Sequence, residues 1–392
     1  MTNSLQPQAH KTYYGLDTLR ALAVIMAILF HYPRWFPHPA WFPDVLKFGW
    51  TGVDLFFVLS GFLISSQLFA QIKKEGSFSM KEFYIKRFFR ILPVYYFVLA
   101  LYFIFPVLSA PQLMPPLWKF LTFTQNFAAN FETHRGFGVV WSLCVEEHFY
   151  LLLPVTLLLL LKNGWYKKAG MLLLVLFVAG FLIRLYSYYN IYLAQTNGTD
   201  NRSLWVSTIY YPTYCRLDGL LAGVSIAALY NYLPAAFARL SKYANVFIAA
   251  GLLLLTIAYF ICENALGFGR SIFGFPLISI GFGCLVLGAI MPGSFLYKWK
   301  SAAMSMIARL SYSLYLIHMG VILIMQKLFS YWGLAIESNL MFVLCMLFCV
   351  VFSLLLHYSI EKPFMKMRDR FLKPMNPRGE MKIVFTAAKS ES

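Results

Sequence analysis

The sequence predicts an all-α polytopic membrane protein with about ten transmembrane helices and with both termini in the cytosol. Its 392 residues are 60% hydrophobic and only 12% charged, whereas about 25% of the residues of a soluble domain are charged. The apolar residues form runs of about 18–25, which are long enough to cross roughly 30 Å of hydrocarbon. Most basic residues lie in the short segments between these runs. These observations exclude a soluble globular protein.

Ten candidate spans follow one another along the chain. They cover residues 15–33, 49–71, 91–109, 140–161, 168–189, 206–230, 244–263, 271–291, 304–326 and 338–359. The segment 115–130 is too short and polar to cross, so we expect it to lie at the interface or to re-enter the membrane. Residues 1–15 hold no apolar core and no cleavage site, so the first span should serve as its own insertion signal. The six cysteines lie in or beside apolar runs without metal-type spacing, and we expect neither disulfides nor a metal site.

The basic residues indicate the orientation of the spans. With the N-terminus inside, 22 of the 33 Lys and Arg residues fall in inner segments, 7 in outer segments and 4 within spans. Cytoplasmic loops carry such an excess, so both termini should be cytosolic and the number of spans even. The net charge of +17 therefore reflects membrane topology and does not indicate nucleic acid. We expect a transmembrane domain over 1–360 and a cytosolic basic tail over 361–392.

Polar side chains within the spans sort by depth in this orientation. The inner half holds Arg20, Arg87, Arg90, Arg309 and Glu361; Arg216 and Asp218 lie near the midplane; the outer half holds His31, Asp54, Glu146, Glu147 and His318. Charged groups in a bilayer are costly and commonly mark functional sites. An anionic ligand that enters from the cytosol would explain the inner cations. Proton transfer near the outer face would explain the outer carboxylates and imidazoles.

Arg20 and His31 lie on one face of the first span. Eleven residues turn a helix through about 1100°, roughly 20° from three full turns, and rise about 16 Å. Asp17 shares the face of Arg20 and could pair with it. We therefore expect Arg20 and His31 to be two ends of one path, with an anion-binding mouth below and a base above.

Each of these residues also has a purely structural interpretation. Arg87 and Arg90 could be ordinary positive-inside residues. Asp17 and Arg20 could form an interfacial ion pair. A lone membrane histidine is often a helix–helix hydrogen bonder, which is the interpretation we favour for His318.

Two further patterns bear on the outer half. Glu146 and Glu147 point about 100° apart on a helix, so only one should face a given site. Glu146 is favoured because Ser142 and Tyr150 share its face.

Several motifs resemble the acyltransferase-3 family of integral membrane acyltransferases. They are "YYGLDTLRALAVIMAILFHY", "GWTGVDLFFVLSGFLIS", "KRFFRILPVYY", "VVWSLCVEEHFYLLLP", "RLDGLLAG", "ARLSYSLYLIHM" and "SIEKPFMKM", in this order over roughly residues 13–367. The resemblance implies transfer of an acyl group, commonly acetyl, from cytosolic acyl-coenzyme A to a sugar hydroxyl. The acceptor would be a cell-envelope glycan, a lipid-linked glycan or a glycoside, which places the protein in a bacterial inner membrane.

The resemblance also carries over individual residues. The family's functional Arg and His of the first span match Arg20 and His31, and its Arg-x-x-Arg motif matches Arg87 and Arg90. Its acidic residue in "WSLxxE" matches Glu146, and its terminal "E-[KR]-P" begins at Glu361. Because the chain ends about 30 residues after the last span, we expect a stand-alone member without an appended esterase-like domain. Such a member would complete transfer alone or with a separate extracytoplasmic partner.

The expected mechanism follows the sorting by depth. Coenzyme A would place its phosphates near Arg87, Arg90 and Arg20, because guanidinium groups bind phosphate in a bidentate manner. Its thioester would then reach His31, which would act as general base on the acceptor hydroxyl or carry the acyl group briefly.

Other details of this mechanism stay open. Asp54 or Glu146 would orient the imidazole. Tyr150, Ser142 or a backbone N–H would stabilise the oxyanion.

Two other classes of function fit part of the sequence. A secondary transporter would also have many spans and charged groups near the midplane, although no internal repeat is visible. A non-catalytic partner in glycan assembly would share the membrane setting. Transfer of radiolabel from acetyl-coenzyme A would argue against both.

Overall fold

The computed structural model describes residues 13–109, 112–127, 136–196 and 199–372. Ten helices of 15 residues or more form the framework: α1 (Tyr14–Trp35), α2 (Gly52–Glu75), α3 (Met80–Ile104), α5 (Trp141–Lys162), α6 (Ala169–Tyr186), α9 (Asp218–Tyr232), α11 (Ala244–Ile261), α12 (Phe275–Ile290), α14 (Ala302–Tyr331) and α15 (Asn339–Leu356). Shorter helices join them: α4 (Leu117–Leu121), α7 (Ala194–Thr196), α8 (Arg202–Trp205), α10 (Pro234–Leu240), α13 (Phe295–Lys298) and α16 (Lys362–Phe371). The described residues form no strand, so the predicted all-α polytopic class is confirmed.

The span predicted at 206–230 is interrupted. Nine helices of the described ranges are long and apolar enough to cross a membrane, and the expected tenth is divided into a π-helical turn, Val206–Tyr210, and the 15-residue helix α9. Pro212 supplies no N–H for a helical hydrogen bond. A backbone carbonyl near the break accepts a hydrogen bond from another helix, since Arg184 Nη1 of α6 donates to Cys215 O over 2.8 Å. Of the ten predicted spans, nine therefore correspond to continuous helices and one, at 206–230, to an interrupted segment.

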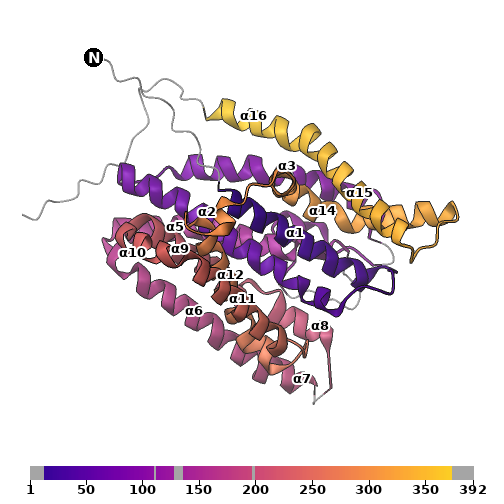
Figure 1. The fold of residues 1–392 in the computed structure, drawn as a ribbon, viewed down its shortest axis with the longest axis horizontal. Helices are drawn as coiled ribbons and strands as arrows, with labels where there is room; N and C mark the ends of the chain where they lie inside the picture. Colours follow the sequence, from indigo (N-terminus) through magenta and orange to yellow (C-terminus); the bar gives the residue numbers. More distant parts are fainter. Residues whose placement is uncertain (1–12, 110–111, 128–135, 197–198, 373–392) are drawn as a thin grey trace, which may run out of the picture.

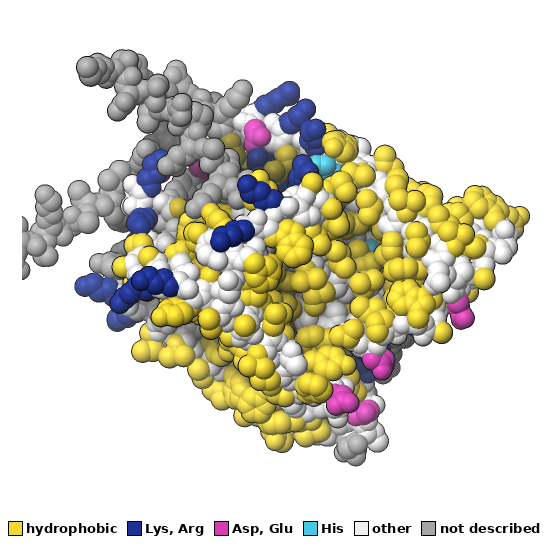
Figure 2. Space-filling view, viewed as in Figure 1, with side chains coloured by type: hydrophobic (Ala, Val, Ile, Leu, Met, Phe, Trp, Pro, Cys, Tyr) yellow, Lys and Arg dark blue, Asp and Glu magenta, His cyan; other side chains and the backbone are white. Residues whose placement is uncertain are grey.

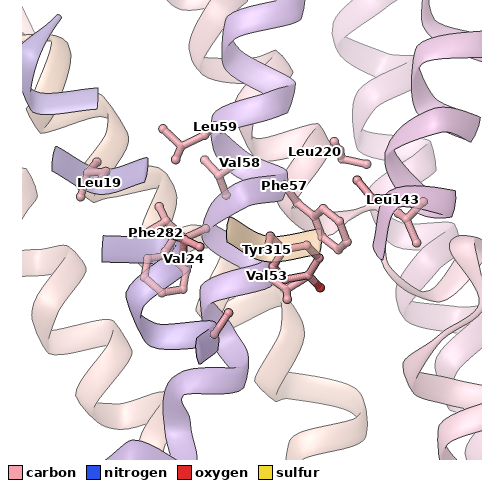
Figure 3. Close-up of a cluster of buried hydrophobic side chains, with 14 of the residues drawn as sticks. Leu19, Val24, Val53, Phe57, Val58, Leu59, Leu143, Leu220, Phe282 and Tyr315 are labelled. Carbon is pink, nitrogen blue, oxygen red and sulfur yellow. The ribbon is translucent and has the colours of Figure 1, made fainter. Parts of the chain in front are cut away.

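Helices α2 and α9 pack backbone against backbone at the centre of the molecule. A Cβ atom on Gly61 would lie 2.2 Å from the carbonyl oxygen of Leu220, and one on Gly223 would lie 2.3 Å from that of Val58. Only glycine permits such an approach, which is a common way for membrane helices to associate. The buried side chains around this contact come from α1, α2, α5, α9, α12 and α14 (Figure 3).

Charge is distributed unevenly along the bundle. Figure 2 shows most Lys and Arg gathered at one end of the visible face, most Asp and Glu toward the other, and an apolar band between them. Helix α1 begins and α16 ends toward the basic end (Figure 1). We call this end the inner end, because the basic excess should face the cytosol.

Candidate functional site

An inner cavity of about 410 Å³ lies among α1, α2, α3, α5, α14 and α16. Its charged lining residues are Arg20, Arg87, Arg90, Glu146 and Arg368. The structure thus brings together the three arginines predicted to bind an anion, although they come from two different helices. Arg368 is a further cation that the sequence analysis did not single out. Its signal was the short basic stretch that follows "EKP".

The arginines of the inner cavity differ in their partners. Arg90 forms an ion pair with the buried carboxylate of Glu361, which also lies 3.0 Å from His357 Nδ1. Arg20 and Arg87 make no hydrogen bond or ion pair with any other described residue, and Arg87 Nε is buried without a partner. The expected pairing of Arg20 with Asp17 is absent there too, because Asp17 accepts a hydrogen bond from Ser305 Oγ over 3.1 Å. Two guanidinium groups are therefore left for an anionic ligand.

Glu146 belongs to the inner cavity as well. Its Oε2 accepts hydrogen bonds from Ser60 Oγ over 2.9 Å and from the Tyr150 hydroxyl over 2.6 Å. Neither cavity described here is lined by Glu147. The structure therefore places Glu146 beside the arginines and does not bring it to the imidazole of His31.

A second, outer cavity of about 160 Å³ contains His31. Its walls are largely aromatic: Phe30, Trp35, Trp50, Trp141, Trp205, Tyr210, Tyr211 and Tyr315. Aromatic walls with a few polar groups are typical of sites for small organic ligands. The cavity can therefore hold an apolar ring face against aromatic rings and a polar group against the imidazole.

His31 forms a hydrogen bond with a second histidine. Its Nδ1 lies 2.9 Å from Nε2 of His318, and Nδ1 of the fully buried His318 lies 2.8 Å from the carbonyl oxygen of Tyr315. A carbonyl only accepts, so His318 Nδ1 carries the hydrogen and its Nε2 must accept from His31 Nδ1. The neutral His31 ring then carries its lone pair on Nε2. These two hydrogen bonds determine that Nε2 is the nitrogen of His31 that can take a proton.

The sequence analysis favoured a helix–helix hydrogen bond for His318, and its contact with His31 joins α14 to α1 in this way. His318 lies 287 residues from His31, so no local spacing could reveal the contact. The available signal was that both imidazoles lie in the outer half of their spans.

The two cavities meet at Val53 and Tyr315, which line both of them. The Tyr315 hydroxyl donates to the carbonyl oxygen of Val139 over 2.9 Å and lies 2.9 Å from Ser142 Oγ, so this side chain is held in place. The expectation of one continuous path is therefore wrong in its simple form. Arg20 and His31 line adjacent cavities, because the side chains of Val53 and Tyr315 fill the space between them.

Asp54 does not lie beside His31. Its carboxylate is 2.7 Å from Nη2 of Arg216, and both side chains are almost fully buried. Neither cavity is lined by Asp54. A parallel pair joins Arg184 to Asp218 over 2.6 Å. Equal depth in the membrane placed Asp54 near His31 in the prediction, but its direction around the helix turns it toward Arg216.

Metal ligands are not gathered in the described part of the chain, where no three His, Cys, Asp or Glu side chains are grouped to hold an ion.

Comparisons with known proteins complete the description of the site. The chain is 32% identical over 243 residues to the peptidoglycan O-acetyltransferase OatA of Listeria monocytogenes, which covers 58% of this chain and 36% of that protein. It is 27% identical to a putative peptidoglycan O-acetyltransferase, YrhL, of Bacillus subtilis, over 91% of this chain and 55% of that protein. A putative O-acetyltransferase of Staphylococcus aureus is also 27% identical, over 90% of this chain and 57% of its own length.

The chain thus spans little more than half the length of these relatives, or less. No solved structure matches it. The sequence profile of the acyltransferase-3 family, described as an acyltransferase domain, matches residues 13–358. That range includes both cavities except for the contribution of α16. The chain therefore belongs to the acyltransferase-3 family.

Proposed function

We propose that the protein transfers an acetyl group from acetyl-coenzyme A to a hydroxyl group of a cell-wall glycan. The observation that carries the proposal is the hydrogen-bond chain from Tyr315 through His318 to His31, which leaves a basic nitrogen at an aromatic cavity beside an arginine-lined one. The names of the similar bacterial proteins support a glycan acceptor such as peptidoglycan. This setting implies a bacterial inner membrane, with donor and acceptor on opposite sides.

The inner cavity is the proposed donor site. Arg20 and Arg87 lack protein partners among the described residues, and a guanidinium group forms paired, charge-assisted hydrogen bonds with phosphate. Arg90 would contribute less, because Glu361 already neutralises it. Arg368 lies on α16 and lines the same cavity, so it would add a cation from the C-terminal helix. Glu146 would hold Tyr150 and Ser60 in place and act as a positioning residue.

The acyl group must pass the contact between the two cavities. The pantetheine arm would extend from the inner cavity past Val53 and Tyr315, which form the shared wall. Its thioester would then lie near His31. The rise of about 16 Å between Arg20 and His31 on α1 sets the length that the arm must cover.

His31 is the proposed general base. The acceptor hydroxyl oxygen attacks the thioester carbonyl carbon while its proton moves to His31 Nε2. The carbon–sulfur bond then breaks, and the same proton passes to the thiolate, which yields the acetyl ester, free coenzyme A and the neutral imidazole. His318 would hold the His31 ring in the productive tautomer, a task that a carboxylate performs in a serine-protease triad. Asp54 would act only indirectly, by fixing Arg216 and thus the aromatic wall that Arg216 contacts.

Label transfer tests the proposal. Purified protein in proteoliposomes would receive acetyl-coenzyme A labelled in the acetyl group, together with cell-wall glycan fragments. We expect alkali-labile label on the glycan, and a mass increase of one acetyl group by mass spectrometry. Movement of glycan across the bilayer without a donor would instead indicate a transporter. Label transfer that another envelope protein performs equally well without this chain would indicate a non-catalytic partner, whereas transfer that requires both proteins would indicate the separate extracytoplasmic partner expected from the sequence.

A further inference from the structure

Arginine is concentrated at the outer cavity without matching acids. Its charged lining residues are Arg34, Arg202 and Arg270, and none of the described lining residues is Asp or Glu. Cations at the outer end also run against the general excess of basic residues at the inner end. These arginines therefore call for an explanation other than membrane topology.

Arg270 is held between aromatic rings. Its guanidinium carbon lies 4.1 Å from the ring centroid of Trp50 and 5.0 Å from that of Trp205. The second indole is itself fixed, since Trp205 Nε1 donates to Ser271 Oγ over 2.8 Å. Such cation–π contacts hold a guanidinium group in place but use none of its five N–H donors. Arg270 makes no hydrogen bond or ion pair with the rest of the described chain, and its Nε is buried without a partner.

Two other buried arginines in the same region have a structural role, and each of them forms an ion pair with an aspartate. Arg184 pairs with Asp218, and Arg216 pairs with Asp54. Both of these arginines also contact the ring of Phe275. An uncompensated charge inside a protein is strongly destabilising. The chain thus supplies an ion-pair partner to each of these two buried guanidinium groups. Arg270, which faces the outer cavity, forms no ion pair with a described residue, and the nearby carboxylate of Asp54 that acts on its charge is already paired with Arg216.

We propose that the outer cavity selects an acceptor glycan that carries a negatively charged group, and that Arg270 binds this group. The inference rests on the proposed function and names the acceptor class more closely. A carboxylate or phosphate on the glycan matches the paired donors of a guanidinium group. The sugar ring would lie against the aromatic walls, and its hydroxyl would be brought to His31 Nε2. Arg270 is thus a specificity-determining residue, and Arg202 lies on the same cavity as a second cation.

A matched pair of acceptors tests this inference. Cell-wall glycan fragments would be prepared with a free carboxylate on the sugar and, separately, with that carboxylate as its methyl ester. Acetyl transfer by the full chain in neutral detergent would be measured for both. We expect kcat/KM to favour the charged fragment by about tenfold or more, the size of a hydrogen bond to a charged group. This measurement on the unmodified protein needs no variant to fold.

Substitution then assigns the preference to one side chain. Arg270→Gln should lower kcat/KM for the charged fragment to that for its ester, mainly through KM, and leave the affinity for coenzyme A unchanged. Arg270→Lys should keep part of the preference. Arg309→Gln is the matched control, because Arg309 lines neither cavity, and it should keep the full preference.

The outcomes separate this inference from the proposed function. Transfer to neither fragment would refute both, whereas equal kcat/KM for both fragments would refute only the inference. An equal loss on both fragments in Arg270→Gln would also overturn it. Phosphatidylglycerol vesicles distinguish a lipid headgroup as the source of the anion. Inhibition of the unmodified protein but not of Arg270→Gln by these vesicles would assign the site to lipid and contradict an acceptor site.

Discussion

The inner and outer cavities share two wall residues but differ in the ionisable side chains that line them. The inner cavity presents permanently charged guanidinium groups together with the carboxylate of Glu146. The outer cavity also has arginines in its lining, but it alone presents an imidazole, that of His31, hydrogen-bonded to a buried neutral acceptor and surrounded by aromatic rings. A fixed cation can hold a phosphate but cannot accept a proton, whereas an imidazole can. The difference indicates that different residues bind the donor and accept the proton, so mutations should affect the two steps separately.

The largest effect should come from the outer cavity. His31→Ala should lower acetyl transfer by about 10³-fold, because general bases contribute roughly 10²–10⁴-fold. The Kd for coenzyme A should stay within about twofold if the inner cavity is a separate donor site. His38→Ala is the matched control, since His38 bonds to the carbonyl of Phe36 and lines neither cavity. Near-normal transfer by His31→Ala would refute the assignment of the base.

The second effect concerns the partner of the base. His318→Ala should lower kcat by about 10–100-fold, because His31 loses the acceptor that fixes its tautomer. His318→Gln should retain more activity, since its amide oxygen can accept from His31 Nδ1. The measurement is kcat and KM for acetyl-coenzyme A in both variants. A change in KM at constant kcat would contradict the positioning role.

The third effect concerns the inner cavity, where substitutions should change the affinity for coenzyme A and leave the acyl-transfer step unchanged. Arg87→Ala should raise the Kd for coenzyme A by about tenfold, the size of one charge-assisted hydrogen bond. Arg90→Ala should raise it less, because Glu361 already pairs with Arg90. Isothermal titration measures both, with Lys86→Ala as a control on the same helix that removes a partly exposed pair with Glu82. A larger effect from Arg90 than from Arg87 would reverse the proposed division between them.

The smallest effect should come from the wall that the cavities share. Tyr315→Phe keeps the ring but leaves the carbonyl of Val139 without its hydroxyl partner. We expect a loss of about 1 kcal/mol in the free energy of unfolding and only a severalfold change in kcat. Denaturant unfolding and steady-state kinetics provide the two values. A loss of activity as large as that of His31→Ala would place the Tyr315 hydroxyl in the reaction itself.

The face that Arg20 and His31 share on one helix was predictable from the sequence, but contacts between helices were not, and Glu146, expected in the outer half with His31, lines the inner cavity with Arg20. Within one helix, the 100° turn per residue places Arg20 and His31 on one face. Between helices, no such rule applies. Asp54 and His318 were both at the depth of His31, yet only His318 contacts it, while Asp54 pairs with Arg216. The division of the interior into two cavities that share Val53 and Tyr315 was also beyond prediction, because it depends on how side chains of different helices pack.

Hydropathy likewise concealed the interruption between Tyr210 and Asp218. A sliding average over 206–230 is apolar enough for a span, although Pro212 and the ion-paired Arg216 lie within it. The sequence analysis placed Arg216 and Asp218 near the midplane of a continuous span, and the partners that make the break stable are remote in the chain. They include Arg184 of α6 and Asn126, whose Nδ2 donates to the carbonyl of Tyr211 over 3.2 Å.

The interrupted span also bears on how the protein is made. A continuous apolar helix can enter the bilayer alone, because it satisfies its own backbone. The segment around Pro212 and Arg216 has no such independence, since its polar groups depend on Asp54, Asn126 and Arg184. All three precede it in the chain and are synthesised first. The groups that stabilise this segment within the bilayer are therefore already present in the chain when the segment is synthesised.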